Sequence, residues 1–506
     1  MASVSPSREE FLSFARDYTV VPVWREVLAD LETPVSAFAK MVGVAADAPS
    51  GFLLESVERA ERWGRFSFLG RDPAATLVVR GNDVQVTGEL GEQIPRDRGA
   101  LAALEAIIDH YRAPVIPELP PFHGGVVGYL GYGVVREVEN LPNPPPDDRQ
   151  IPDAVLSLTG HVTAFDHYRQ RLTLIENVFC HPDDSDATRN QAYDDAVSRL
   201  DLSVAELAKP LAYAPSPPPT GDHSSVQVKS SFTKPDYLAA VEAAREHILA
   251  GDIFQVVLSQ RFDVEGAVDP FDAYRALRQI NPSPYMYLVR NPEVTLVGSS
   301  PEPMVRVLDD QVIIRPIAGT RFRGKDAEHD QRLAAELAEN PKERAEHVML
   351  VDLARNDIGR VIEFGSETVD ELMTLERYSH VMHLTSQVSG RLRSGKNAVD
   401  VLRATFPAGT VSGAPKVRAM EIIDDLEPVA RGPYAGVVGY LDFSGNLDTA
   451  IAIRTLVCRD GHASITAGAG IVADSDPVDE EMECRNKARA LLSAVAASRR
   501  LDQVGE

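Results

Sequence analysis

The sequence predicts an α+β fold, with antiparallel sheets packed together and helices around them. Strand-like segments mostly follow one another along the chain, and helical segments stand in separate blocks, which is α+β order rather than a regular βαβ series. The chain has 506 residues, of which 44% are hydrophobic and 25% charged, as in ordinary soluble globular proteins. This length is enough for a large core or for two domains.

The first part of the chain mixes strands and helices. Residues 77–86 predict a hairpin with Gly-Asn-Asp at its turn, and residues 101–112 predict a helix. Residues 154–178 predict two strands joined near Asp166. Residues 185–208 alternate acidic and apolar side chains at helical spacing.

A proline-rich segment at residues 209–224 interrupts this pattern and indicates a linker or an exposed loop. We therefore expect an N-terminal subdomain at residues 1–208 and a larger domain at residues 225–506. The larger domain is expected to open with a helix from Lys234 to Ala250, ended by Gly251.

Strands and helices then follow in blocks. Five strands are expected at 254–264, 284–290, 294–300, 304–308 and 311–319, helices at 327–339 and 341–354, and later strands at 437–443, 449–460 and 462–472.

Two short acidic helices, far apart in the chain, are expected to open in the same way. One begins Asn340-Pro341 and the other Asp476-Pro477. Proline is favoured at the first helical position because its missing N–H would be unpaired there, and the residue before it can act as a cap.

Each of these helices offers a pair of carboxylates one turn apart on one face: Glu343 with Glu346, and Glu480 with Glu483. Two such faces brought opposite each other make an oxygen-rich site for a hard divalent cation, most simply Mg²⁺. The alternative is two solvated faces, because acidic runs usually face water.

Glycine marks three further segments, residues 317–320, 412–416 and 467–470, at predicted strand ends or before helices. Without a Cβ, glycine lets backbone N–H groups approach a ligand closely, and pairs of such groups bind carboxylates. Most glycine-rich turns are only turns, so this signal is weak by itself.

Three basic or titratable side chains stand out. Arg454 interrupts an apolar strand, and it is either an edge-strand arginine reaching solvent or a bidentate clamp for a substrate carboxylate. Lys487 lies four residues past Glu483, so it either pairs with it or gives the same anion a second cation. His383, three residues after His380, is either a satisfied core histidine or a general acid.

The net charge of −24, from 75 acidic and 51 basic residues, argues against a nucleic acid or a membrane as partner. The three cysteines form no CxxC pair, which fits a reducing cytoplasm. The start of the chain does not read as a signal peptide, and no stretch approaches the roughly 18 apolar residues of a membrane helix.

Ordered motifs extend along nearly the whole chain. They are LLES at 53–56, GRFSFLG at 64–70, NPSPYMYL at 281–288, SPE at 300–302, RPIAGT at 315–320, EHVMLVDLARND at 346–357, YSHVMHL at 378–384, FPAGTVSGAPKVRAMEII at 406–423, GPYAGVVGY at 432–440, AIAIRT at 450–455, GAGIVADS at 468–475 and EMECRNKA at 481–488. The chain thereby resembles the chorismate-utilising enzyme family, in particular its anthranilate synthase large-subunit (component I) branch.

This resemblance implies a lyase reaction in which chorismate, a dianion, binds with its ring carboxylate on Mg²⁺, is aminated by ammonia and loses pyruvate. It implies Glu346 and Glu483 as Mg²⁺ ligands, with Glu343 and Glu480 behind them. The implied chorismate-binding residues are Gly319, Thr320, Tyr434, Arg454, Gly468, Ala469, Gly470 and Lys487. The resemblance also implies catalytic roles for Thr320 and for His383, which would help the C4 hydroxyl to leave.

Two positions bear on the type of reaction. Relatives that attack chorismate with water tend to have lysine where this chain has Gln255, and relatives that make aminodeoxychorismate have a nucleophilic lysine at the position of Ala318. Direct attack by ammonia is what remains. The alternatives are aminodeoxychorismate or salicylate synthase, or a regulatory relative without catalysis.

The resemblance further implies a separate glutamine amidotransferase subunit as the source of ammonia, because no cysteine of this chain lies in a G-x-C-x-G elbow. It also implies feedback inhibition by tryptophan. The implied tryptophan site includes Ser56 of the N-terminal subdomain and Pro284, Tyr285 and Met286.

Overall fold

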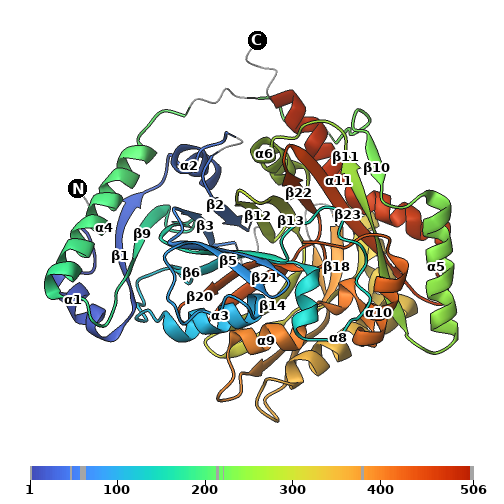
Figure 1. Ribbon diagram of the computed structural model, residues 1–506. Helices are drawn as coiled ribbons and strands as arrows, with labels where there is room; N and C mark the ends of the chain where they lie inside the picture. The colour runs from blue at the N-terminus through green and yellow to red at the C-terminus, as the bar shows by residue number, and fades with distance from the viewer. Residues whose placement is uncertain are drawn as a thin grey trace.

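The computed structural model describes residues 3–45, 48–56, 64–211, 216–219, 221–377 and 381–501. Two large antiparallel sheets form the centre of the molecule, and helices lie around them (Figure 1). Every described strand pair within these sheets is antiparallel, which confirms the expected α+β class.

The first sheet, called sheet A here, has the order β1-β9-β8-β3-β2-β12-β13-β22-β23-β11-β10, with β19 paired to β11. Its strands are β1 (Val20–Leu28), β2 (Gly51–Glu55), β3 (Phe66–Arg71), β8 (His161–Asp166), β9 (Arg171–Phe179), β10 (Val228–Ser230), β11 (Gln255–Val264), β12 (Tyr285–Arg290), β13 (Thr295–Ser300), β19 (Gly413–Ala414), β22 (Thr455–Arg459) and β23 (His462–Ile471).

The second sheet, called sheet B here, has the order β16-β18-β15-β14-β21-β20-β6-β7-β4-β5, with β17 paired to β18. Its strands are β4 (Ala75–Arg80), β5 (Asp83–Gly88), β6 (Gly125–Leu130), β7 (Ala154–Leu158), β14 (Pro303–Leu308), β15 (Gln311–Ile314), β16 (Ile317–Phe322), β17 (Thr368–Arg377), β18 (Val381–Arg391), β20 (Val437–Asp442) and β21 (Leu447–Ile451).

Helices surround the two sheets. They are α1 (Arg8–Asp17), α2 (Pro34–Met41), α3 (Gly99–His110), α4 (Asp186–Leu207), α5 (Lys234–Leu249), α6 (Pro270–Ile280), α7 (Ala327–Glu339), α8 (Pro341–Gly359), α9 (Ala398–Thr405), α10 (Lys416–Leu426) and α11 (Pro477–Leu501), with the short 3₁₀ segments η1 (Tyr132–Glu137) and η2 (Gly409–Val411). Helix α11 packs against β23, α5 and α6.

Strands from both sides of residues 209–224 take part in each sheet. Sheet A joins the two parts where β2 pairs with β12, and sheet B joins them where β6 pairs with β20. The core is continuous across the first junction, since Leu53 and Leu288 are buried in the same apolar cluster. Burying side chains of this size stabilises the fold by about 1.5–3 kcal/mol each.

Most expected elements are present, but three expected strands are broken. Residues 154–178 form three strands, β7, β8 and β9, rather than two. The chain turns at Gly160, where a Cβ would lie 2.5 Å from the carbonyl oxygen of Asp72. Residues 311–319 form β15 and the start of β16, separated at Pro316, whose ring nitrogen has no hydrogen to donate to a ladder.

The third broken strand, residues 449–460, bears directly on function. It forms β21 in sheet B and β22 in sheet A, and the chain crosses between the sheets at residues 452–454. Arg454 has a positive φ of 51° at this crossing. Such a left-handed backbone cannot continue a strand, so Arg454 stands where the two sheets meet instead of within one of them.

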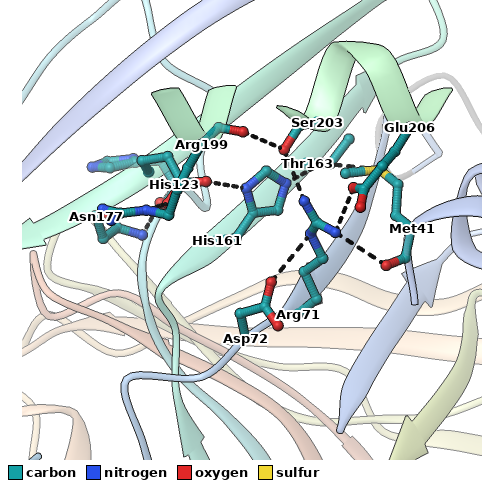
Figure 2. A network of polar contacts seen from close by, with 11 residues as sticks. Met41, Arg71, Asp72, His123, His161, Thr163, Asn177, Arg199, Ser203 and Glu206 are labelled. Atoms are coloured by element: carbon teal, nitrogen blue, oxygen red, sulfur yellow. Dashed lines mark hydrogen bonds and ion pairs between the residues drawn. The ribbon is translucent and has the colours of Figure 1, made fainter. Parts of the chain in front are cut away.

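A buried polar network fixes α4 to the sheet that carries β2 (Figure 2). His161 Nδ1 lies 2.7 Å from Glu176 Oε1, and Arg199 Nε of α4 donates to Glu176 Oε2 at 2.8 Å. Arg71 donates to Ser203 of α4 at 3.0 Å. Because buried charges are costly unless they are paired, these contacts hold α4 in one position on sheet A.

Candidate active site

The two acidic helices begin as the sequence predicts. The Asn340 side chain accepts hydrogen bonds from the backbone N–H groups of Lys342 and Glu343, at 3.0 and 3.1 Å. Asp476 Oδ1 accepts from Val478 and Asp479 at 2.9 and 3.2 Å. Each cap satisfies two of the first four N–H groups of its helix and fixes where the helix starts.

The carboxylates of the two helices lie close to one another. Burial raises the pKa of the Glu346 carboxyl, and the negative charges of Glu343 on the same helix and Glu483 on α11 raise this pKa further. Burial likewise raises the pKa of Glu480, with an added contribution from Glu483. Glu346 and Glu480 are partly buried, so the two faces meet instead of standing separately in water.

Cations and an amide already touch three of these carboxylates. Arg321 Nη1 lies 3.0 Å from Glu343 Oε1, and Lys487 Nζ lies 2.6 Å from Glu483 Oε1. Gln255 Nε2 donates to Glu346 Oε1 at 3.3 Å. With the side chains in these positions, no three His, Cys, Asp or Glu side chains of the described residues lie close enough together to bind one metal ion.

The donor chemistry nevertheless fits a hard cation. Glu346 and Glu480 are oxygen donors whose pKa values are raised mainly by burial and further by the negative charge of neighbouring carboxylates. A divalent cation relieves this repulsion, and carboxylate oxygens are the ligands that Mg²⁺ accepts. Mg²⁺ at Glu346 and Glu483 therefore stays a prediction that the residues present can satisfy.

Small residues on β23 let other groups approach its backbone. Gly468, Ala469 and Gly470 pair with β11. A Cβ on Gly468 would lie 2.7 Å from the Tyr434 hydroxyl, and a Cβ on Gly470 would lie 2.7 Å from Gln255 Nε2. The backbone here is thus crowded by polar side chains of the site.

A glycine in the segment 317–320 also lets the backbone lie close to a carboxylate of the site. Gly319 on β16 has a φ of 64°, which favours glycine, and its Cβ would lie 2.9 Å from Glu343 Oε2. The neighbouring Thr320 belongs to β16, and its side chain lies outside the described structure.

Arg454 and Lys487 reach the site from different elements. Burial lowers the pKa of the Arg454 guanidinium, while the nearby Glu483 and Tyr434 groups act in the opposite direction. Lys487 Nζ also donates to the carbonyl oxygen of Gly468 at 2.8 Å, so it both pairs with Glu483 and touches the small-residue strand. Two cations beside a strand of small residues suit an anion with more than one carboxylate.

His383 lies on β18, opposite Thr320 in the strand register. Its Nδ1 is 3.3 Å from the carbonyl oxygen of Gly319. Burial lowers the pKa of the imidazole, and the charge of Arg454 lowers it further, so the ring is neutral near pH 7. His380 lies outside the described residues.

Glu302 is a site residue that the sequence reasoning missed. Burial raises the pKa of its carboxyl to about 8, against smaller opposing effects of Thr410 and Lys487. It is therefore a carboxylic acid that keeps its proton at neutral pH. The SPE segment at 300–302 held the signal, because a glutamate between expected strands had no partner at any local spacing.

The residues expected to bind tryptophan come together on sheet A. Ser56 follows Glu55, which is opposite Met286 in the register of β2 and β12. The Ser56 hydroxyl oxygen is buried, and no partner for it is found among the described residues. Tyr285 instead donates to Asp448 Oδ1 of sheet B at 2.9 Å, so its hydroxyl is already engaged. Pro284 directly precedes β12.

The fold has two large antiparallel sheets, and carboxylates and cations gather near Arg454, where the chain crosses from one sheet to the other. A model of the chorismate binding enzymes matches residues 53–493. The chain therefore belongs to the family of chorismate-binding enzymes.

Individual relatives and solved structures with similar sequences narrow this class. The chain is 47% identical to anthranilate synthase component 1 of Mycolicibacterium smegmatis, over 97% of this chain and 94% of that protein. It is 45% identical to the protein of the same name from Acetivibrio thermocellus, over 97% and 98% of the two chains. The crystal structure of anthranilate synthase component I from Streptococcus pneumoniae matches with a TM-score of 0.74 and 35% identity, over 92% of this chain and 99% of that one.

A more distant structure shares the fold alone. The menaquinone-specific isochorismate synthase of Escherichia coli matches with a TM-score of 0.68 at 19% identity, over 97% of this chain and 99% of that one.

None of the described helices is long and apolar enough to cross a membrane.

Proposed function

We propose that this chain is the large subunit of an anthranilate synthase, which converts chorismate and ammonia into anthranilate and pyruvate. The observation that carries the proposal is the meeting of the Glu346 and Glu483 faces beside Arg454, Lys487 and the β23 glycines. This combination suits a dianionic substrate held jointly by a metal and by placed cations. The high identity to anthranilate synthase component 1 proteins supports the same conclusion.

The substrate's two carboxylates are assigned to different groups. Arg454 binds one of them, because a guanidinium matches the two oxygens of a carboxylate. The backbone N–H groups around Gly468 and Gly470 and the ammonium of Lys487 bind the other end of the substrate. These groups orient the ring so that its reacting face is held still, and such positioning contributes strongly to rate.

Mg²⁺ would be held by Glu346 and Glu483, with Glu343 and Glu480 behind them, and it would supply positive charge to a substrate carboxylate. The protein's own cations Arg321 and Lys487 then keep the surrounding carboxylates from repelling the substrate.

Loss of the C4 hydroxyl requires a proton. Glu302 holds one at neutral pH, since the pKa of its carboxyl is raised to about 8. His383 is neutral and hydrogen-bonded to Gly319, so it assists by orienting the leaving oxygen or passing a proton to it. The two residues thus share a task that the family resemblance implies for His383.

The choice of ammonia over other nucleophiles rests on two side chains. Gln255 is uncharged and is hydrogen-bonded to Glu346, so it is not a base for activating water. Ala318 is buried and has no nucleophilic group. Free ammonia is the nucleophile that needs neither, and we infer that a glutamine amidotransferase subunit supplies it.

The proposal also covers how the enzyme is inhibited and in which cellular compartment it works. We infer that tryptophan binds near Ser56 and Met286 and inhibits the reaction. The three free cysteines are compatible with a reducing cytoplasm as the compartment.

Product analysis tests the proposal. The isolated chain, given chorismate, Mg²⁺ and ammonium chloride, should release fluorescent anthranilate and an equal amount of pyruvate. It should make none from glutamine alone. Accumulation of aminodeoxychorismate, release of salicylate, or no turnover at all would each support one of the rival functions.

A further inference from the structure

A buried ion pair with no role in the steps above lies behind the candidate active site. Arg431 follows α10, and its side chain is only 1% exposed. Its Nε donates to Glu427 Oε2 at 2.8 Å, and its Nη2 donates to Glu427 Oε1 at 2.6 Å. This two-point contact fixes the plane of the guanidinium as well as its position.

The same guanidinium is bonded to the backbone of two segments that carry site residues. Its Nη2 donates to the carbonyl oxygen of Val257 and its Nη1 to that of Val411, each at 2.7 Å. Val257 lies on β11, where it pairs with Gly470 of β23. Val411 ends η2 directly after Thr410, whose side chain hydrogen-bonds to Glu302. One side chain thus joins the strand behind the β23 glycines to the segment that contacts Glu302.

Glu427 adds a second connection to β11. Its Oε1 accepts hydrogen bonds from the backbone N–H of Ser259 at 2.8 Å and from the Ser259 hydroxyl at 2.9 Å. Ser259 lies opposite Gly468 in the register of β11 and β23. The ion pair is therefore bonded to β11 at the two residues that pair with Gly468 and Gly470.

The guanidinium also lies over two tyrosine rings. Its central carbon is 4.8 Å from the centroid of the Tyr132 ring and 5.6 Å from that of the Tyr434 ring. At these distances a cation is attracted to the face of an aromatic ring. The Tyr434 hydroxyl, at the other end of its ring, lies where a Cβ on Gly468 would be only 2.7 Å away. Arg431 and Gly468 thus confine Tyr434 at its face and at its hydroxyl end.

Stability alone does not account for this arrangement. Burial acts to lower the pKa of the Arg431 guanidinium, and the charge and hydrogen bonds of Glu427 outweigh it, so the pair is ionised. Buried ion pairs can often be replaced by uncharged side chains with little loss of stability. Uncharged side chains cannot replace a planar fork that joins two carbonyl groups, a carboxylate and a tyrosine ring.

We propose that Arg431 is a positioning residue for the reaction, which holds the Tyr434 ring, β11 and η2 in the arrangement that the substrate requires. Because its side chain is enclosed, Arg431 acts through its neighbours and not by contact with the substrate. It acts through Tyr434 on the binding of chorismate and through Thr410 on Glu302. The inference rests on the proposed function and adds to it a residue behind the site.

Two variants separate positioning from stability. Arg431→Lys keeps a cation beside Glu427 but lacks the planar fork, so it cannot reach both carbonyl groups. Arg431→Met combined with Glu427→Gln removes both charges and keeps an amide oxygen that accepts from Ser259. The matched control is Arg25→Lys. Arg25 is 6% exposed, is bonded to Asp201 at 2.6 Å, and lies on β1 at the far end of sheet A from β11.

Steady-state kinetics with Mg²⁺ and ammonium chloride measure the effect. We expect kcat/KM for chorismate to fall about 100-fold in Arg431→Lys and in the uncharged double variant, the scale of a displacement of about 1 Å in the site. The unfolding temperature of the double variant should stay close to that of the wild type. Arg25→Lys should keep the wild-type kcat/KM.

A double-mutant cycle gives a measurement that a merely structural role would not change. Tyr434→Phe keeps the ring and removes the hydroxyl beside Gly468. Because Arg431 acts in part by holding this hydroxyl, Arg431→Lys should lower kcat/KM by only about tenfold in the Tyr434→Phe background.

The outcomes separate this inference from the proposed function. If the wild type makes anthranilate and both Arg431 variants keep its kcat/KM for chorismate, the inference is wrong. Independent, multiplying losses in the cycle, loss of the fold in both Arg431 variants, or an equal loss of activity in Arg25→Lys would make the pair a structural one and also overturn it. If the wild type makes no anthranilate, the proposed function fails. Calorimetry of chorismate binding with Mg²⁺ then still tests whether Arg431→Lys weakens that binding.

Discussion

The backbone N–H of Ser299 donates a hydrogen bond to the carbonyl oxygen of Arg454, with 3.1 Å between nitrogen and oxygen. Ser299 lies on β13, directly opposite Met286 of β12. Arg454 is the residue at which the chain crosses from sheet B to sheet A. The strand expected to bind tryptophan, β12, is therefore joined to the backbone of Arg454 through its neighbour β13 and this one hydrogen bond.

The first prediction concerns the metal. Glu346→Gln and Glu483→Gln each remove one charged ligand from a site that must also hold a dianion. We expect either variant to lose more than about 100-fold in kcat at millimolar Mg²⁺, with an unchanged circular dichroism spectrum. Glu242→Gln, at an exposed position on α5, should be neutral. Near-normal turnover in both site variants would mean that these carboxylates form a solvated face.

The second prediction concerns His383. His383→Met keeps the size of the side chain but removes the group next to Gly319. We expect product formation to slow by roughly 10²–10⁴, the usual scale of acid–base assistance. An aminated intermediate that keeps the enolpyruvyl group should accumulate, which chromatography of a quenched reaction would detect. A higher KM for chorismate with unchanged kcat would assign His383 to binding instead.

The part of the site that depends on local sequence could be predicted. The caps at Asn340 and Asp476 and the two carboxylate pairs follow from spacing along single helices, and the structure has them as expected. The opposition of the two helices could not be derived from spacing, because it depends on contacts more than a hundred residues apart in sequence. The resemblance to known enzymes supplied it.

The strand break near Arg454 and the raised pKa of Glu302 could not be predicted from local sequence patterns. The residues on both sides of Arg454 are mostly apolar or small, so the sequence pattern predicts one continuous strand. In the structure the same residues form two strands, which belong to different sheets. The raised pKa of Glu302 arises from burial by distant segments, which no local spacing reveals. Gly160 and Pro316 did carry signals for their breaks, since glycine and proline commonly end strands.

The third prediction is a pH dependence at Glu302. When the rate is expressed against free NH₃, wild-type kcat should fall as pH rises through about 8, because the carboxyl then loses the proton that it donates. Glu302→Gln cannot donate a proton in the same way and should be slower by roughly 10²–10⁴, with no such fall. A wild-type profile that stays flat up to pH 9 would contradict this role.

The same group gives a fourth prediction, on stability. The unfolded chain releases the Glu302 proton near its ordinary pKa of 4.5, whereas the folded protein keeps it until about pH 8. The folded state thus binds more protons between these values, so the contribution of Glu302 to the free energy of unfolding falls as pH rises from 4.5 to 8. Urea unfolding at pH 5 and pH 8 should show a smaller decline for Glu302→Gln than for the wild type. An equal decline would mean that Glu302 is ionised in the folded protein.

The last prediction concerns tryptophan and its coupling to chorismate. The Ser56 hydroxyl oxygen is buried without a partner in the described structure, and it follows Glu55, which pairs with Met286. We expect this hydroxyl to bind the tryptophan amino group, while the indole packs near Met286 and Pro284. A shift of β12 would be passed through β13 and the Ser299 hydrogen bond to Arg454.

An effector acts only through its different affinities for two states, and the coupling is reciprocal. Tryptophan titrated by calorimetry should therefore bind more weakly when chorismate is present, by the same factor by which it weakens chorismate, typically about 5–150-fold. Ser56→Phe should lose tryptophan binding and keep catalysis, while Ser198→Phe, at an exposed position on α4, should keep both. Full inhibition of Ser56→Phe by tryptophan would place the regulatory site elsewhere, and equal affinity with and without chorismate would remove the link through Ser299 and Arg454.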